Sequence, residues 1–171
     1  QVVNVAPPQA VSNLGIQIVA DAIDVSWSPI TLDTDGFPTS INHYVIYRGT
    51  EAYFTPTPGD SIGGTDAVIT SFTDADIFGA NVVGDTLNQY FYAVEAVDIF
   101  GSRSAASNRV GEYDYQLVTT ATTDYNLIAA PFAGNGITDA DGLIAAIGNS
   151  NVNTVNRYNA ISQSYEARFA A

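Results

Sequence analysis

Alternating apolar and polar side chains run through most of the first two thirds of the chain and predict β-strands. The clearest run is residues 89–97, where every second side chain from Tyr90 to Ala96 falls on one face of an extended chain. That face is rich in aromatic residues and is predicted to be buried. Similar runs occupy residues 11–18, 23–27 and 41–50.

Turn signals separate these runs and set the predicted architecture. Segments rich in Pro, Asp and Gly interrupt the strands at 28–40, 53–67, 76–86 and 98–101. Short strands divided by such turns, with no helical period between them, favour a β-sandwich. Residues 68–74 and 102–118 are expected to supply the remaining strands.

The pattern changes after about Val118. A small-residue connector, 119–124, leads to an apolar run at 125–132 that is expected to form a buried strand. Thr138 is then a suitable N-cap with Asp141 three residues later, which predicts a short helix that Gly148 ends. A hairpin centred on residues 159–161 follows. Residues 119–171 therefore read as a small β-α-β-β unit, marginal in size for a core of its own.

The first nine residues are set apart from the rest. Residues 1–5 have the composition of a short strand, but Pro7 and Pro8 forbid regular pairing and form a stiff spacer. The predicted organisation is an N-terminal strand or linker at 1–9, a sandwich at 10–118 and the α+β unit at 119–171. We expect the last unit to be incomplete alone.

Residues 6–113 resemble a fibronectin type III domain. The resemblance rests on a Pro-containing opening strand, a core tryptophan on the second strand, an inward-facing pair on the third and a corner tyrosine: residues 6–14, Trp27, Tyr44, Ile46 and Tyr90. It implies an immunoglobulin-like sandwich that acts as a spacer or interaction module. The Arg-Gly-Asp tripeptide of one family member is absent, so integrin binding is not implied.

The tail resembles, more loosely, small modules at the ends of bacterial surface and secreted proteins. The matching elements are an "NLI" strand at 126–128 with Pro131 beyond it, and a "VNRYN" hairpin strand at 155–159. In such modules further strands follow the hairpin.

Charge and composition narrow the classes of function. The chain carries 18 Asp and Glu against five Lys and Arg, all Arg, for a net charge of −13. Such acidity disfavours nucleic acids and anionic membrane surfaces. No apolar run approaches the roughly 18 residues of a membrane-spanning helix. Cysteine is absent, which excludes disulfides and thiol catalysis. Lys and Met are absent too, a composition that suggests an extracellular or cell-surface protein.

Residues with catalytic or metal-binding chemistry are few, and each has an ordinary structural explanation. His43 is the sole histidine and is expected on a sheet face, away from any activated serine. The Asp pairs 74/76 and 139/141 lie in a turn and at a helix start, where Asp is common. Asp33 and Asp35 form a weak calcium candidate without the closing Glu of an EF-hand loop. We expect no enzyme activity and no cofactor, apart from this weak calcium site.

Two functional hypotheses remain open. In the first, the chain is a subunit of an extracellular filament, a homopolymer in which the strand at 1–5 of one copy completes the tail unit of the next. Its interface residues would be Val2, Val3, Val5, Leu127, Ile128, Tyr165 and Phe169. In the second, the chain is an accessory spacer, adhesion or carbohydrate-binding module of a larger secreted enzyme or adhesin. Candidate sugar-stacking aromatics are Tyr47, Tyr53, Phe54, Phe91 and Tyr165.

Overall fold

The computed structural model describes residues 6–19, 22–75, 88–112, 139–147, 154–159 and 161–169. The chain divides into two compact units, Gln1–Pro131 and Phe132–Ala171. This division and the predicted boundary at 118/119 both fall outside the described residues, so the boundary stays a prediction. The structure is mainly β, as the alternating pattern predicts.

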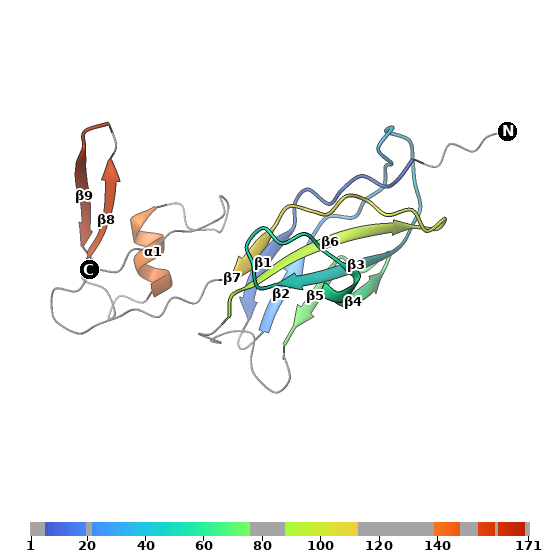
Figure 1. Ribbon diagram of the computed structural model, residues 1–171, viewed down its shortest axis with the longest axis horizontal. Helices are drawn as coiled ribbons and strands as arrows, with labels where there is room; N and C mark the ends of the chain where they lie inside the picture. The colour runs from blue at the N-terminus through green and yellow to red at the C-terminus, as the bar shows by residue number, and fades with distance from the viewer. Residues whose placement is uncertain are drawn as a thin grey trace. The chain divides into compact units, whose positions relative to one another are not determined.

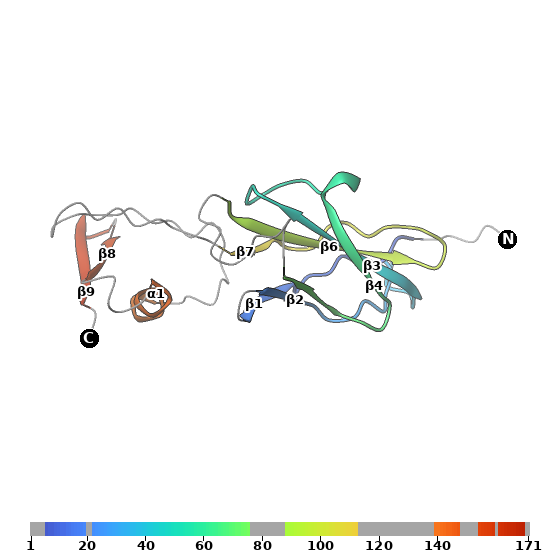
Figure 2. The ribbon, with the colours of Figure 1, turned by 90° about the horizontal axis from the view of Figure 1, so that it is seen from below.

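The first unit is a sandwich of two antiparallel sheets (Figures 1 and 2). The sheet with the order β1-β2-β5 contains β1 (Gly15–Val19), β2 (Ala22–Ser26) and β5 (Ser71–Asp74). The sheet with the order β4-β3-β6-β7 contains β4 (Ser61–Asp66), β3 (Ile41–Gly49), β6 (Tyr90–Asp98) and β7 (Val110–Glu112). A 3₁₀ turn, η1 (Pro58–Asp60), precedes β4.

The core lies between the sheets and confirms the period-two prediction. Trp27, just after β2, meets Tyr44 of β3 edge to face, with ring centroids 5.2 Å apart. The inward side chains of β6 are all buried, from Tyr90 and Tyr92 to Ala96. Each large apolar side chain buried here contributes about 1.5–3 kcal/mol relative to exposure. The core is completed by Val11, Leu14, Ile23, Val25, Ile46 and Val94.

Strand β4 lies inside a segment that the sequence predicts as turn-rich. Its Gly63 and Gly64 lower strand propensity, but the fold needs them. A Cβ at Gly63 would lie 2.8 Å from the ring of Phe72 on β5, and one at Gly64 would lie 2.9 Å from the carbonyl oxygen of Tyr44. Close packing therefore outweighs local propensity.

Residues 103–109 follow β6 through both backbone and side-chain hydrogen bonds. The hydroxyls of Ser104 and Ser107 accept the backbone N–H groups of Ala96 and Val94, at 2.9 and 3.0 Å. Asn108 exchanges two hydrogen bonds with the backbone of Leu14, at 2.9 and 3.0 Å. Asn108 thus connects the segment before β7 to the segment before β1.

The described part of the second unit contains α1 (Ala140–Ile147), β8 (Thr154–Asn159) and β9 (Ser164–Phe169). The hairpin is confirmed, with Asn159 opposite Ser164. The carboxylate of Asp139 accepts the N–H of Gly142 at 2.8 Å and so caps the helix. The predicted cap, Thr138, lies outside the described residues, as does the predicted strand at 125–132. Among the helix side chains whose burial is described, that of Ile144 is buried.

Candidate functional site

The most densely bonded polar cluster joins the two sheets of the sandwich. Arg48 on β3 donates to both carboxylate oxygens of Asp74 on β5, at 3.0 and 2.7 Å. The hydroxyl of Tyr92 on β6 donates to the same carboxylate at 2.8 Å. The guanidinium also lies 5.4 Å from the ring centroid of Tyr90. Three strands that meet only in the folded state therefore converge on one carboxylate.

Burial determines the electrostatics of this cluster. The side chains of Arg48 and Asp74 are 17% and 7% exposed, so their attraction is only partly screened. Burial raises the pKa of Tyr92, and the charge and hydrogen bond of Asp74 raise that pKa further. Tyr92 thus remains a neutral donor at physiological pH. The arrangement is suited to holding the two sheets together, because Arg48, Asp74 and Tyr92 satisfy one another's charges and hydrogen bonds.

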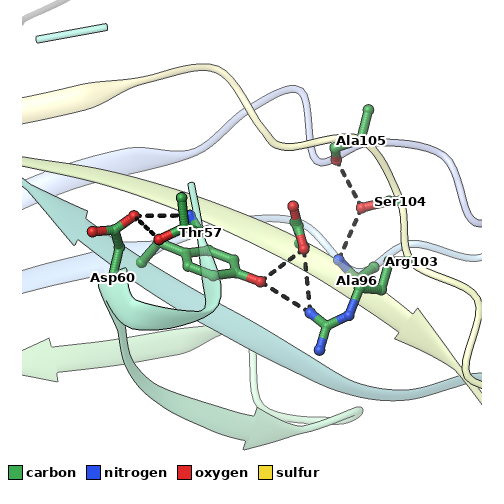
Figure 3. Close-up of polar contacts among 8 residues, drawn as sticks. Thr57, Asp60, Ala96, Arg103, Ser104 and Ala105 are labelled. Atoms are coloured by element: carbon green, nitrogen blue, oxygen red, sulfur yellow. Dashed lines mark hydrogen bonds and ion pairs between the residues drawn. The ribbon is translucent and has the colours of Figure 1, made fainter. Parts of the chain in front are cut away.

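A polar recess of about 350 Å³ borders this cluster at the end of the sandwich where β6 begins. It is lined by Arg48, Gly49, Thr50, Asp60, Asn88 and Tyr90. The carboxylate of Asp60 accepts the backbone N–H and the hydroxyl of Thr57, at 2.8 and 2.7 Å, and so closes η1 (Figure 3). Among the described lining residues, the one carboxylate is thus engaged in a local turn.

A second polar cluster lies on the outer face of the four-stranded sheet. The hydroxyl of Tyr47 donates to the carboxylate of Glu95 at 2.8 Å, and Arg103 donates to that hydroxyl at 2.9 Å (Figure 3). Arg103 also forms an ion pair with Glu95 at 3.3 Å. About half of the Arg103 side chain is exposed. Burial is the main cause that raises the pKa of Tyr47, followed by its hydrogen bond to Glu95.

The outer face is more deeply buried than the sequence predicts. Tyr47 and Phe91 are 4% and 2% exposed, so they cannot contribute to a sugar-stacking platform. The loop after β3 supplies part of the cover. Arg109 donates to the carbonyl of Phe54 and lies 5.2 Å from its ring centroid. Of the predicted platform, Tyr53 and Tyr165 are exposed.

Asp33 and Asp35, the calcium candidates, lie in a tight turn. One carboxylate oxygen of Asp33 accepts the N–H groups of Asp35 and Phe37, at 3.0 and 2.8 Å. That oxygen therefore already accepts two backbone hydrogen bonds. Among the described residues no group of three or more His, Cys, Asp or Glu side chains is placed to hold a metal. The weak calcium site stays a prediction.

The same turn recurs between β6 and residue 103. There one carboxylate oxygen of Asp98 accepts the N–H groups of Phe100 and Ser102, at 2.9 and 2.7 Å. In both turns a glycine three residues after the Asp has a positive φ, +85° at Gly36 and +87° at Gly101. Both are three-residue loops with a glycine in the left-handed region, a common hairpin geometry. Local backbone geometry thus accounts for both aspartates.

Only some of the remaining predicted residues lie in the part of the chain that the structure describes. Val2, Val3, Val5, Leu127 and Ile128 lie outside the described residues, and so does Asp76. Tyr165 on β9 is 72% exposed, and Phe169 is the last residue of that strand. His43 is on β3 and half-buried, on the face opposite Tyr44 as predicted. In the part of the chain that the structure describes, no helix is long and apolar enough to span a membrane.

Sequence reasoning overlooked the Arg48–Asp74–Tyr92 cluster. A signal was present, because the alternation that places Tyr44 and Ile46 inward also places Arg48 inward. A cation on a core face requires an anion nearby. The identity of that anion was not predictable, since Asp74 comes from the opposite sheet.

Comparison with known proteins yields similarities of fold alone. No family model and no curated protein match the chain. Pectate lyase PelI from Erwinia chrysanthemi is 26% identical, over 62% of this chain and 28% of that chain, with a TM-score of 0.40. The spore cortex lytic enzyme SleM from Clostridium perfringens is 18% identical, over 66% and 29%, with a TM-score of 0.40. The central fibronectin-III array of RIM-binding protein is 15% identical, over 58% and 32%, with a TM-score of 0.39.

The chain spans less than a third of each of these structures. The feature that the chain shares with these structures is a general one, a fibronectin-like β fold. The likeness of the C-terminal unit to bacterial surface modules stays a prediction.

Proposed function

We propose that this chain is a non-catalytic accessory module of a larger extracellular polypeptide, in which the sandwich is a rigid spacer. The observation that carries the proposal is that Pro8 and Glu112, close to the first and the last described residues of the sandwich, lie at its opposite ends. Pro8 pairs with Asp33, whose loop lies at the end where β6 finishes. Glu112 pairs with Tyr90, where β6 begins.

The separation of these ends gives the spacer its length. β6 runs nine residues from Tyr90 to Asp98, which at about 3.3 Å per residue is roughly 30 Å. The described segments before β1 and before β7 lie along this axis and are tied to each other through Asn108. A folded body with opposed attachment points fixes both distance and direction, whereas a flexible linker fixes neither.

Composition supports an extracellular setting. The chain has a net charge of −13, no cysteine and no methionine. High acidity keeps a protein soluble and discourages association with anionic surfaces. In the two polar clusters of the described sandwich, the side chains hydrogen-bond to one another, as expected for a module that resists tension.

Strand exchange between copies is the second candidate, and one observation favours it. Among the described residues, β8 and β9 form a sheet of two strands, and residues 161–167 are exposed throughout. A two-stranded hairpin is marginally stable alone and presents an edge to which another strand could add. Tyr165 and Phe169 would then lie at the acceptor, and Val2, Val3 and Val5 on the donor.

One experiment separates the two candidates. The native protein is isolated with an antibody raised against residues 6–112, sequenced by mass spectrometry after Glu-C digestion, and imaged by negative-stain electron microscopy. We expect peptides from beyond these 171 residues in the same polypeptide, and dispersed particles. Fibres built from a repeating 171-residue subunit would overturn the accessory role and support strand exchange.

A further inference from the structure

Strand β9 forms an edge in the described part of the second unit. Among the described residues, β9 pairs with β8 alone, and the two strands make a complete small sheet. The helix α1 lies beside β8 (Figure 1). Residues 161–167, which include the first four positions of β9, are exposed throughout. A two-stranded sheet is marginally stable, and its edge is a template for a further strand.

The charge of this hairpin sets it apart from the rest of the chain. Residues 154–169 contain two of the five arginines and one of the 18 acidic residues, so they carry a net charge of +1 in a chain of −13. Two copies of a chain with so high a net charge repel each other. A contact between copies is therefore least opposed where acidic residues are few, and the hairpin is such a place.

The sequence of β9 is complementary to itself in one antiparallel register. When two copies of β9 run antiparallel with Ala167 opposite Ala167, Glu166 of each copy is opposite Arg168 of the other. In the same register, Tyr165 of each copy is opposite Phe169 of the other. Opposite charges and paired aromatic residues both stabilise neighbouring strands. One register therefore supplies two pairs of opposite charge and two aromatic pairs at once.

The neighbouring two-fold registers are electrostatically unfavourable. A pair of strands centred on Glu166 places two glutamates opposite each other, and a pair centred on Arg168 does the same with two arginines. Charge thus selects the register centred on Ala167. Because both copies use the same strand, the contact is two-fold symmetric and closes as a dimer.

The charge pattern also continues into β8. Arg157 of β8 is opposite Glu166 within one hairpin. In the sheet that two hairpins would form, with the order β8-β9-β9-β8, one row of positions carries Arg157 and Glu166 of one copy and then Arg168 of the other. The charges along this row alternate in sign. A sheet of four strands also exceeds the size at which a sheet becomes independently stable.

We propose that two copies of this chain associate through β9, which pairs antiparallel with itself about Ala167 to form a continuous four-stranded sheet. The contact is six residues long, about 20 Å, so the interface is small and the dimer is reversible. This inference goes beyond the accessory role and does not depend on it, because any two polypeptides that contain this unit would be joined. It also differs from strand exchange, in which the edge of β9 receives residues 1–5 and the assembly stays open.

Sedimentation velocity of the 171-residue chain tests the association. We expect the mass to rise reversibly from that of one chain to that of two as the concentration increases from about 1 µM to about 500 µM. A single chain at every concentration would overturn the dimer. Assemblies that grow beyond two copies would overturn it too and would support strand exchange. Neither result would bear on the accessory role, which the sequencing of the native polypeptide tests.

Exchange of charges tests the register. Glu166→Arg places arginine opposite arginine and Arg168→Glu places glutamate opposite glutamate, so each variant alone should raise the dissociation constant at least about tenfold. The two variants are complementary to each other, and an equal mixture should associate about as tightly as the wild type. Glu51→Arg makes the first charge change at an exposed position of the sandwich and should have no effect. Normal association of either single variant, or no association in the mixture, would contradict the register.

A cysteine variant gives a measurement that requires no change of charge. In the proposed dimer the two Cβ atoms at position 167 lie about 4.5–5.5 Å apart, close to the separation that a disulfide spans. The chain has no native cysteine, so Ala167→Cys adds the single thiol. In oxidised glutathione we expect Ala167→Cys to form covalent dimers at least about tenfold faster than Ser162→Cys, an exposed position in the turn between β8 and β9. Equal rates would overturn the pairing about Ala167, whatever the stability of the charge variants.

Discussion

At the scale of single residues, most of the conspicuous aspartates stabilise backbone turns. Asp33 and Asp98 each accept two N–H groups with one carboxylate oxygen, and Asp60 closes η1. Asp74 differs, because it joins two sheets. A sequence rich in acidic turns can therefore suggest metal loops while the carboxylates satisfy the backbone instead.

The two matched turns depend on their glycines. Gly36 and Gly101 have φ values of +85° and +87°, and a Cβ at either would meet no atom within 4 Å. Replacing either with alanine should therefore cost only the left-handed backbone strain, about 1–2 kcal/mol of unfolding free energy. Gly59→Ala, which has neither a positive φ nor a close contact, should change stability by less than about 0.5 kcal/mol. Urea unfolding measures all three, and equal losses would contradict this account of the turns.

Tyr92 should make the sandwich sensitive to alkaline pH. The pKa of Tyr92 is raised in the folded state, so Tyr92 contributes its full stabilisation below the unfolded-state pKa of about 10. This stabilisation is lost progressively as the pH rises above about 10. The expected loss is about 1.4 kcal/mol per pH unit from this group. In Tyr92→Phe the decline in unfolding free energy above pH 10 should be shallower by that amount. Tyr53→Phe is the exposed control and should follow the wild type; identical slopes in all three proteins would refute the assignment.

At the scale of elements, periodicity predicted the strands whose two faces differ. In β2 and β3 the inward residues are buried as expected, and in β6 the inward residues are buried although most of the outer face is buried too. β4 was missed because Gly63 and Gly64 serve packing against Phe72 and Tyr44, and such contacts between distant segments leave no local pattern. The burial of Phe91 on the outer face was missed for the same reason. The helix was predicted, but its observed cap is Asp139.

The tie between the sheets should be the most sensitive polar contact in the sandwich. Asp74→Ala would leave the largely buried guanidinium of Arg48 without its anion and the hydroxyl of Tyr92 without its acceptor. We expect a loss of about 3–5 kcal/mol in unfolding free energy. Asp24→Ala removes an acceptor for the Thr73 hydroxyl at the surface of the neighbouring strand and should cost less than about 1 kcal/mol.

Chemical denaturation of the two aspartate variants provides the comparison. If Asp74→Ala proved as mild as Asp24→Ala, the cluster would be a solvated surface network and would not tie the sheets together.

At the scale of the whole molecule, the fold class followed from the sequence, while the direction of the chain through the sandwich did not. The expectation that the chain is not an enzyme stays a prediction. Opposed ends emerge only when Pro8 is seen to pair with Asp33 and Glu112 with Tyr90. The strand-exchange hypothesis relied on a donor strand at residues 1–5 and an acceptor edge at 125–131 or 163–169. Residues 1–5 and 125–131 lie outside the described residues, 163–169 contains β9, and the hypothesis stays a prediction.

A spacer with opposed ends should resist tension. A force applied between the ends acts along β6, and the hydrogen bonds between β6 and β7 lie across that direction. These bonds would be loaded in shear and would have to break together. The Asn108 bonds to Leu14 add a second cross-connection.

The most direct test of the spacer role is single-molecule stretching. Handles are attached to cysteines introduced by Gln9→Cys and Asp114→Cys. Attachment is specific because the chain has no native cysteine. The account predicts one cooperative unfolding event, with a contour-length gain of roughly 340 Å for the released residues. Unfolding in several small steps at forces of only a few piconewtons would contradict it, because such a body could not hold its neighbours at a fixed separation.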